Sequence, residues 1–394
     1  ELARKPRPSP RALAAAASLA ALGTLGAGTP LETTTSGEVA FYADTNAVLV
    51  VSPSVAARVG PTTGELEARG SYLVDVVSAA SIDIVTTASP RWTEVRQEGT
   101  LGARATSGRE ELDLSLAAST EPDTLSLAGA VSAAHRGERG TLGLSYSLAR
   151  DLAGRRGTPF SVVSRELFRH QLGLSAEGAL DPATLLGLRL DLGLDHGDPS
   201  KPYRMLPLFD AAIAPAIRPG ESLARVNELR LPARLGERLP SRRLRAAVAG
   251  RIARHLGPLV LSSSLRVEAD EWERVTSTAE LRILARPSRR LLVGPRLRGH
   301  AQTGVSFWRR AYVAEIDPEG AVTVPRYRTG DRELGPLTTA VVGAEAHLGL
   351  GPRRAPHDLR VGLLGDLWLT RFLDTLYLDD RRAVLAAAQF SGVF

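Results

Sequence analysis

The chain has 394 residues, of which 43% are hydrophobic but only 5% aromatic, and its mean hydropathy is -0.05. Cysteine is absent, which excludes disulfides, thiolate metal sites, cysteine nucleophiles and a lipid attached at an N-terminal cysteine. The formal charge of +6 comes almost wholly from arginine, because lysine occurs only at Lys5 and Lys201. Since the arginines are scattered along the chain, we expect no nucleic-acid partner.

The N-terminal segment has the pattern of a secretory signal peptide. A basic stretch at 4–11 precedes an uncharged run from Ala12 to Gly28, and small residues at its end offer a cleavage point. After this run, no segment approaches the ~20 apolar residues that a membrane-spanning helix needs. We expect residues 1–28 to direct export and residues 29–394 to form one domain, with an amphipathic or buried alanine-rich helix as the alternative for the first segment.

From about residue 38 onward, apolar residues recur with a period of two. In LLGLRLDLGLD (185–195), the leucines from Leu186 to Leu194 share one face, while Arg189 and Asp191 lie on the other. A helix would scatter these leucines around its circumference, so the pattern predicts a strand. The same reasoning predicts strands at 38–45, 47–59, 66–78, 92–106, 110–118, 124–134, 140–150, 166–177, 183–194, 241–254, 258–270, 272–286, 290–303, 337–350, 357–371 and 382–394.

Sixteen strands is an even number, as a closed single-chain bacterial barrel requires. Short and long connections alternate, with long outer loops expected at 195–240 and 304–336. We therefore predict an all-β fold, a transmembrane antiparallel up-and-down β-barrel in the bacterial outer membrane. Fourteen strands is the alternative if 38–59 is one bent strand or the 110–134 hairpin packs elsewhere. A secreted β-sandwich, propeller or β-helix has the same periodicity, but charges in the middle of many polar faces favour the barrel.

The last strand carries an apolar row that ends at Phe394 and includes Phe390. We interpret this row as the candidate assembly signal that the barrel-assembly machinery recognises. Outer-membrane lipid is then a second expected partner. Lipid-facing barrels also carry aromatic girdles at both interfaces, and the candidates near strand ends are Tyr72, Trp92, Tyr146, Trp272, Phe307, Trp308, Tyr312, Trp368 and Phe372.

Several stretches in fixed order resemble a bacterial family of outer-membrane barrels known as domain of unknown function 3570. They are SYLVDVVSAASIDIVTTASPRWTEVRQEG (71–99), KPYRMLPLF (201–209), ADEWERVTSTAEL (269–281), PRLRGHAQTGVSFW (295–308) and RTGDRELGPL (328–337). The resemblance spreads over roughly 38–394 and implies an outer-membrane barrel with no established activity. The chain departs from the family pattern at Gly299 to Gln302 and at Ser264 to Arg266, where the family has more aromatic residues.

Charged residues on the polar faces are expected to line the lumen, because charges are costly against lipid. Opposing rows of arginines and carboxylates would select permeants by charge, or they would pair across neighbouring strands and stiffen the wall. The candidate lumen-lining residues are Glu94, Arg96, Arg189, Asp191, Arg266, Glu268, Asp270, Glu280, Arg282, Arg296, Arg298, His300, Glu345, Arg360 and Asp366.

Other chemistries have weaker patterns. Asp191, Asp195, His196 and Asp198 offer oxygen-rich spacing for calcium, but without the order of a calcium-binding loop. His300 and Ser306 invite comparison with barrel hydrolases, yet the chain has no G-x-S-x-G elbow, H-E-x-x-H or Walker loop. A loop after Asp75 that folds inward as a constriction is a further option.

We therefore expect no enzyme, cofactor or metal site. The leading function is a channel or substrate-specific pore for small solutes. The alternative is a non-conducting scaffold, plugged by its own loops or bound to an envelope protein.

Overall fold

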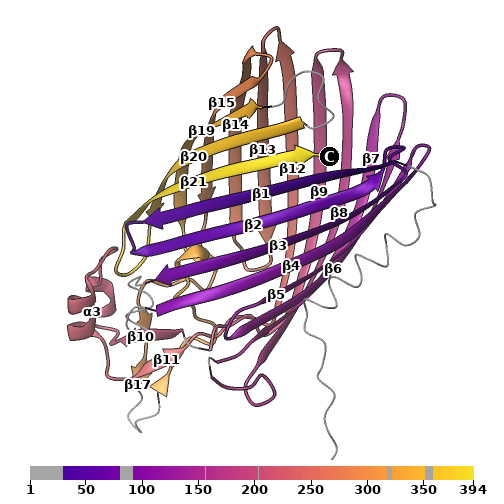
Figure 1. The fold of residues 1–394 in the computed structure, drawn as a ribbon. Helices are drawn as coiled ribbons and strands as arrows, with labels where there is room; N and C mark the ends of the chain where they lie inside the picture. The colour runs from indigo at the N-terminus through magenta and orange to yellow at the C-terminus, as the bar shows by residue number, and fades with distance from the viewer. Residues whose placement is uncertain (1–29, 80–91, 156, 203, 317–321, 351–357) are drawn as a thin grey trace, which may run out of the picture.

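A computed structural model describes residues 30–79, 92–155, 157–202, 204–316, 322–350 and 358–394. Within them, sixteen strands form one closed antiparallel barrel (Figure 1). The predicted fold class and strand number are confirmed, whereas the expected signal peptide lies outside the described residues. The strands are β1 (Leu31–Asp44), β2 (Val48–Pro61), β3 (Leu66–Ala79), β4 (Trp92–Ser107), β5 (Glu110–Thr120), β6 (Thr124–Arg136), β7 (Gly140–Ala153), β8 (Arg165–Asp181), β9 (Thr184–Gly197), β12 (Arg242–Leu256), β13 (Leu259–Asp270), β14 (Val275–Ser288), β15 (Leu291–Gln302), β19 (Leu337–Gly349), β20 (Asp358–Phe372) and β21 (Asp380–Val393).

The last strand closes the barrel by pairing with the first. β21 runs antiparallel to β1 from Thr34↔Val393 to Asp44↔Ala383. Beyond this ladder, Thr33 and Phe394 exchange two backbone hydrogen bonds of 2.9 and 2.8 Å. Closure leaves no unpaired edge, which is the condition for a sheet to cross hydrocarbon.

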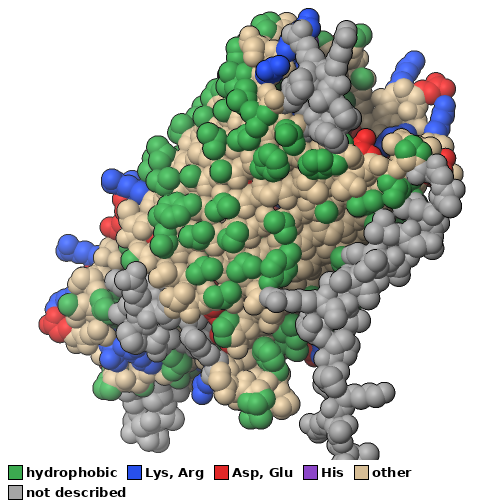
Figure 2. Space-filling view, in the orientation of Figure 1, with side chains coloured by type: hydrophobic (Ala, Val, Ile, Leu, Met, Phe, Trp, Pro, Cys, Tyr) green, Lys and Arg blue, Asp and Glu red, His purple; other side chains and the backbone are tan. Residues whose placement is uncertain are grey.

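The outward face of the wall is apolar. Along β5, Leu112, Leu114 and Leu116 are exposed, with Leu116 at 68%, and the residues between them are less accessible. Figure 2 shows hydrophobic side chains spread over the wall of the barrel, with charged side chains near its two ends. Such an apolar surface is stable in contact with lipid tails and unfavourable in contact with water.

Ion pairs between strands that are not neighbours identify the inward face. Arg69 on β3 contacts Asp113 on β5 at 2.5 Å, and Arg266 on β13 contacts Asp191 on β9 at 2.6 Å. In each case one strand lies between the partners. Side chains converge on the concave side of a barrel and diverge on the convex side, so these residues point into the lumen.

The long connections at one end fold into a small domain, which we call the cap. It consists of residues 198–241, 303–336 and 373–379 where described. Its elements are β10 (Met205–Phe209), η1 (Ala214–Ala216), α3 (Leu223–Leu229), β11 (Arg234–Gly236), β16 (Tyr312–Val313), β17 (Glu315–Ile316), β18 (Val322–Thr323) and η2 (Arg332–Leu334). β10 pairs with both β11 and β16, which joins two loops that are about 100 residues apart in the sequence.

Three buried apolar clusters stabilise the cap. One surrounds Leu206 and Leu208, a second Trp272 and Trp308, and a third Phe209. No helix of the described residues is long and apolar enough to cross a membrane.

Most of the aromatic residues expected to form girdles at the membrane interfaces do not face the lipid. Trp272, Trp308, Tyr312 and Phe372 are buried. Trp368 lies on the inward face by register with Val341. Tyr146 does face outward and is exposed, and its ring centre lies 6.2 Å from that of His170, which stacks on His196. The aromatic residues near strand ends therefore mostly stabilise the loops, because an ordered loop needs its own apolar core.

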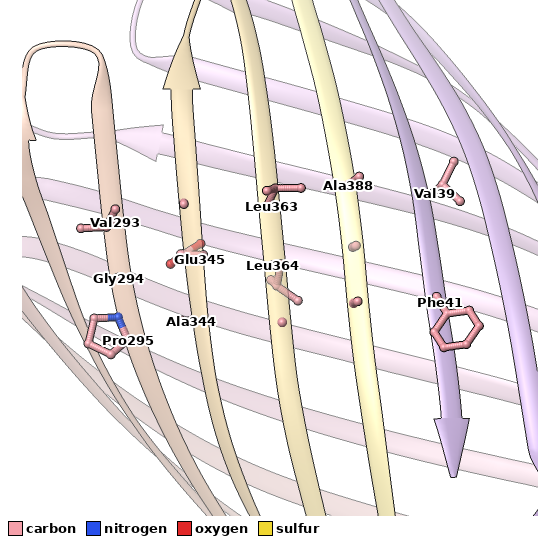
Figure 3. Close-up of a pocket in the computed structure, with 14 residues that line it drawn as sticks. Val39, Phe41, Val293, Gly294, Pro295, Ala344, Glu345, Leu363, Leu364 and Ala388 are labelled. Atoms are coloured by element: carbon pink, nitrogen blue, oxygen red, sulfur yellow. The ribbon is translucent and has the colours of Figure 1, made fainter.

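A hollow of about 800 Å³ lies on the outer wall over β15, β19, β20, β21 and β1 (Figure 3). There the larger outward side chains Val39, Phe41 and Leu363 stand beside Ala386 and Ala388. Its lining is almost wholly apolar. We therefore assign the hollow to the lipid-facing wall and not to a solute site.

Candidate functional site: the charged lumen and its cap

The strand register places all fifteen predicted lumen residues on the inward face. Cross-strand partners share a face: Asp191 pairs with Ala247, which pairs with Glu268, and Arg298 pairs with Val341, which pairs with Trp368. The register shifts in β8–β9 and β14–β15 lie near strand ends, away from these candidates. Because the period of a strand is two, each strand contributes every second residue to the lumen. Their role in selectivity stays a prediction.

The lumen has an acidic side and a basic side. The inward positions of β1–β5 carry nine carboxylates and four arginines, whereas those of β12, β13, β15 and the part of β14 up to residue 284 carry seven arginines and three carboxylates. These two groups of strands lie opposite each other in the ring. The acidic-side carboxylates are Glu32, Glu38, Asp44, Glu67, Asp75, Glu94, Glu98, Glu111 and Asp113. The basic-side arginines are Arg243, Arg245, Arg251, Arg266, Arg282, Arg296 and Arg298.

Several charged groups in the lumen remain accessible to solvent. The side chain of Arg189 is 46% exposed, and those of Arg104 and Arg266 are 40% and 39% exposed, although all three point inward. A lumen filled by side chains would bury them. The interior therefore has space for water beside its charged residues, as expected for a barrel of sixteen strands.

Arg296 and Arg298 have different environments although they are two residues apart. Arg296 makes a bidentate ion pair with Asp366, whose side chain is 1% exposed. Arg298 is exposed, and within the described residues no carboxylate lies within ion-pair distance of it, although Glu280 is its cross-strand neighbour. Arg296 therefore stabilises the wall, and Arg298 offers an uncompensated positive charge to the lumen.

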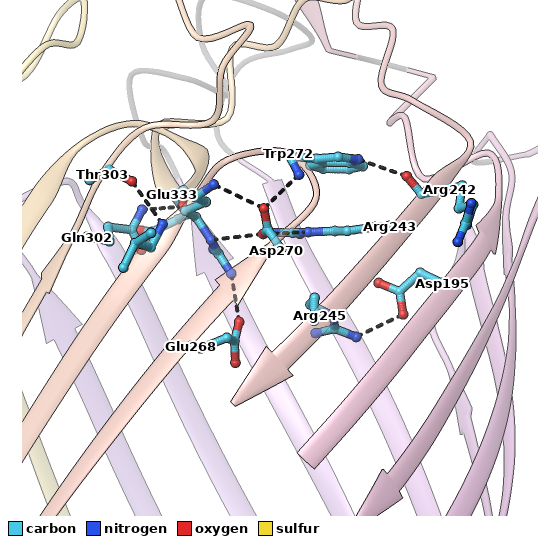
Figure 4. Close-up of polar contacts among 12 residues, drawn as sticks. Asp195, Arg242, Arg243, Arg245, Glu268, Asp270, Trp272, Gln302, Thr303 and Glu333 are labelled. Atoms are coloured by element: carbon cyan, nitrogen blue, oxygen red, sulfur yellow. Dashed lines mark hydrogen bonds and ion pairs between the residues drawn. The ribbon is translucent and has the colours of Figure 1, made fainter. Parts of the chain in front are cut away.

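The basic side continues up to the cap through an ion-pair network (Figure 4). Asp270 pairs with Arg243 and accepts hydrogen bonds from the backbone N–H groups of Trp272 and Arg274, at 2.9 and 3.1 Å. The indole N–H of Trp272 donates to the Arg242 carbonyl at 2.8 Å, and the Arg243 guanidinium lies 4.3 Å from the ring centre. The network fixes the turn between β13 and β14 beneath the cap.

The calcium hypothesis is not supported by the geometry. Asp191 and Asp195 point inward and pair with arginines, at 2.7 Å to Arg189 and 2.8 Å to Arg245. His196 instead lies on the outward face and stacks against Phe168. The alternation of the strand separates the ligands that the spacing had suggested.

The candidates for a hydrolase site and for a constriction lie in the wall and in the cap. His300 contacts the Thr278 hydroxyl at 2.8 Å, while Ser306 lies in the cap, where its N–H donates to the Trp272 carbonyl. Asp75 lies 3.8 Å from Arg96 in the wall, but the segment after it lies outside the described residues.

Sequence reasoning missed an acidic cluster at the cap end of β4–β6. Carboxylate oxygens of Glu94, Glu121 and Asp123 lie within 4.8 Å of one another. Burial raises the pKa of Glu121, and Arg96 opposes this effect from 3.8 Å. The cluster adds to the acidic side at the mouth of the lumen. Only the pairing of the strands brings these residues together.

A buried polar network holds the two large loops of the cap together. The carboxylate of Glu237 has no exposed surface and accepts hydrogen bonds from Arg204, the Lys201 N–H and the Thr329 hydroxyl. Burial lowers the pKa of Arg204, but the Asp331 and Glu237 carboxylates outweigh it and raise this pKa above its usual value.

Tyr312 completes this network. Its hydroxyl accepts a hydrogen bond from the Thr329 N–H at 2.9 Å and donates one to the Thr329 carbonyl at 3.2 Å. Burial raises the pKa of Tyr312 to about 12. The phenol therefore stays neutral over the physiological pH range.

We expect Glu237→Gln to loosen the cap without unfolding the barrel. The amide leaves Arg204 with one carboxylate fewer, and a lost charge-assisted hydrogen bond costs about 1.5 to 3 kcal/mol. Trypsin should then cleave the cap arginines about tenfold faster or more, while the heat-modifiable migration of the barrel in a detergent gel is kept. Glu228→Gln on the exposed face of α3 is the control, and equal cleavage rates in the two variants would contradict the role of Glu237.

The fold and the lumen together define a class of protein. A closed sixteen-stranded barrel with an apolar outer wall and a charged lumen is a transmembrane β-barrel of the bacterial outer membrane. The family described as protein of unknown function (DUF3570) matches residues 162–353, which confirms the family resemblance over that part of the chain.

Solved structures with a similar arrangement include a bacterial polysaccharide outer membrane secretin, with 8% identity, TM-score 0.44, and 93% of this chain and 99% of that chain covered. The outer membrane protein opdK from Pseudomonas aeruginosa has 10% identity, TM-score 0.43 and the same coverage. The siderophore receptor PirA from Pseudomonas aeruginosa has 10% identity and TM-score 0.42, and 86% of this chain spans only 56% of that receptor. No curated protein matches the sequence.

Proposed function

We propose that the protein is a passive pore for small solutes, and that the charges of its lumen select among them. The observation that carries the proposal is the solvent-accessible set of inward-facing arginines in a closed sixteen-stranded barrel. Barrels of this size leave an aqueous channel where loops do not fill it.

The separation of charge supports selectivity. Opposing acidic and basic sides set a field across the lumen, which orients permeants that carry both a charge and a dipole. On the basic side, Arg251 and Arg298 have no carboxylate partner among the described residues. We therefore propose a preference for anions.

We expect Arg298→Ala to shift the ion preference of the pore toward cations. In planar bilayers under a KCl gradient, the reversal potential should move in the cation-selective direction while a steady single-channel current persists. Arg254→Ala is the matched control, because Arg254 lies on the outward face of β12. If Arg298→Ala leaves the reversal potential unchanged, the proposed selectivity of this side is wrong.

The cap favours a second candidate function, a non-conducting scaffold. Its three apolar clusters and its buried Glu237 network make it an ordered structure at the mouth of the barrel. Absence of any current from the folded wild-type protein, with an envelope protein co-purifying, would support the scaffold and refute the pore.

Two further proposals concern the assembly signal and catalysis. Phe390 and Phe394 face outward and are exposed, which supports recognition of β21 by the barrel-assembly machinery. We propose no enzymatic activity, since the His300 ring contacts Thr278 and Gln302 as a wall residue does. Ester hydrolysis by the folded protein would overturn this.

A further inference from the structure

A second charged site lies where the cap meets the barrel. A hollow of about 530 Å³ is lined by Arg165 at the start of β8 and by residues of the cap within 198–200, 236–241 and 326–328. Its volume falls in the usual range for small-molecule sites. Four arginines line it: Arg165, Arg238, Arg326 and Arg328.

The backbone brings two of these arginines side by side. Arg238 and Arg328, 90 positions apart in the sequence, form an antiparallel bridge with N–H···O distances of 3.0 and 2.8 Å. The Arg328 guanidinium donates to the carbonyls of Gly236 and Pro325, at 2.9 and 3.0 Å, and no carboxylate of the described residues lies within ion-pair distance of it. Burial and the neighbouring charge of Arg238 lower the pKa of Arg328.

The other two arginines add charge that is only partly neutralised. Arg326 lies over the ring of Tyr327, with 5.1 Å from its guanidinium carbon to the ring centre. Arg165 lies 3.4 Å from Asp198, which is half-exposed. Glu237 also lines the hollow, but its carboxylate is already bonded to Arg204 and Thr329. Within the described residues, neither Arg238 nor Arg326 has an ion pair.

We propose that this hollow is a binding site for a small anion with at least two carboxylate or phosphate groups. Guanidinium groups bind such oxyanions through paired N–H donors. The face of Tyr327 and the side chain of Leu239 give the carbon skeleton of an organic ligand an apolar contact.

The hollow also leads toward the lumen. It shares Ser241 with a second hollow of about 240 Å³, lined by Arg169, Arg243 and Arg245 on the inward face of the wall. A bound anion would therefore lie at the upper end of the basic side. This part of the inference rests on the proposed pore, whereas binding itself does not.

The test is calorimetric titration of the full chain, folded in detergent, with sodium citrate and with sodium pyrophosphate, using sucrose as the uncharged control. We expect saturable binding of at least one of the two anions and none of sucrose. Binding of citrate alone assigns a carboxylate ligand, and binding of pyrophosphate alone assigns a phosphate ligand. No saturable binding of either anion overturns the proposal.

Two variants that each remove one positive charge distinguish specific binding in the hollow from nonspecific electrostatic attraction. Arg238→Gln should weaken binding about tenfold to a hundredfold, as expected for a lost charge-assisted hydrogen bond. Arg225→Gln, on the exposed face of α3, should leave it within about twofold. Equal weakening in both variants would mean nonspecific attraction and overturn the site. Arg326→Gln serves as the second variant should Arg238→Gln fail to fold.

The outcome is independent of conductance. Binding without any current would refute the pore and retain the site, as in a receptor or scaffold barrel. A current without binding would retain the pore and refute the site.

Discussion

Replacement of Arg296 by alanine is expected to destabilise the barrel by about 3 to 5 kcal/mol, the usual cost of leaving one member of a buried ion pair without its partner. The Asp366 side chain is 1% exposed and meets Arg296 across the intervening strand β19. Without the guanidinium, the carboxylate stays buried and uncompensated. The measurement is urea unfolding of the protein in lipid vesicles, followed by tryptophan fluorescence.

A double variant that lacks both charges provides the control. Arg296→Met combined with Asp366→Leu removes both charges, and we expect it to cost much less than Arg296→Ala alone. Gly343 gives an independent check, because a Cβ at this position would lie 1.8 Å from an oxygen of Asp366. Gly343→Ala should therefore also destabilise the barrel. A loss under about 1 kcal/mol for Arg296→Ala would show that the pair is a surface ion pair in water.

We expect Leu265→Arg to destabilise the barrel by about 2 to 4 kcal/mol, the cost of arginine on the lipid face near the bilayer midplane. Leu265 is in the middle of β13, points outward and is 52% exposed. Its cross-strand neighbours Gly250 and Ala279 offer no compensating charge. Unfolding in vesicles, as for Arg296, measures the effect.

Ser264→Arg is the matched control one residue away. Ser264 points into the lumen between Arg251 and Glu280, where an added arginine meets water and a carboxylate. We expect a change within about 1 kcal/mol at this position. Comparable destabilisation in both variants would contradict the assignment of the outward face to lipid.

Alternation along the chain predicted the wall of this protein closely. The expected strands 183–194 and 241–254 match β9 and β12 to within three residues at each end. Strands that face lipid on one side and water on the other have to alternate, because a single residue out of phase would place a charge in hydrocarbon. The same constraint placed the fifteen charged candidates on the inward face.

The separate roles of residues on that face could not be predicted. Arg296 and Arg298 occupy equivalent positions in the sequence pattern, but only Arg296 meets a buried carboxylate, 70 residues away. Partners across the lumen depend on strand order and stagger, which local periodicity does not encode.

The structure of the cap could not be predicted from the sequence either. Residues 195–240 and 304–336 were expected to be long loops, but nothing in them indicated that Leu206 and Tyr312 would share one core or that Glu237 would join Arg204 to Thr329. Without a regular period, a loop gives no signal of which distant segment it contacts.

By itself, the sequence determined a barrel with an apolar outside and a charged inside, because a wall between hydrocarbon and water imposes one side-chain choice at every second position. Only the tertiary structure decided which charges are neutralised and which have no oppositely charged partner among the described residues. Neutralisation requires two groups within a few ångströms of each other, and the closed ring and the folded cap set those distances between residues far apart in the chain.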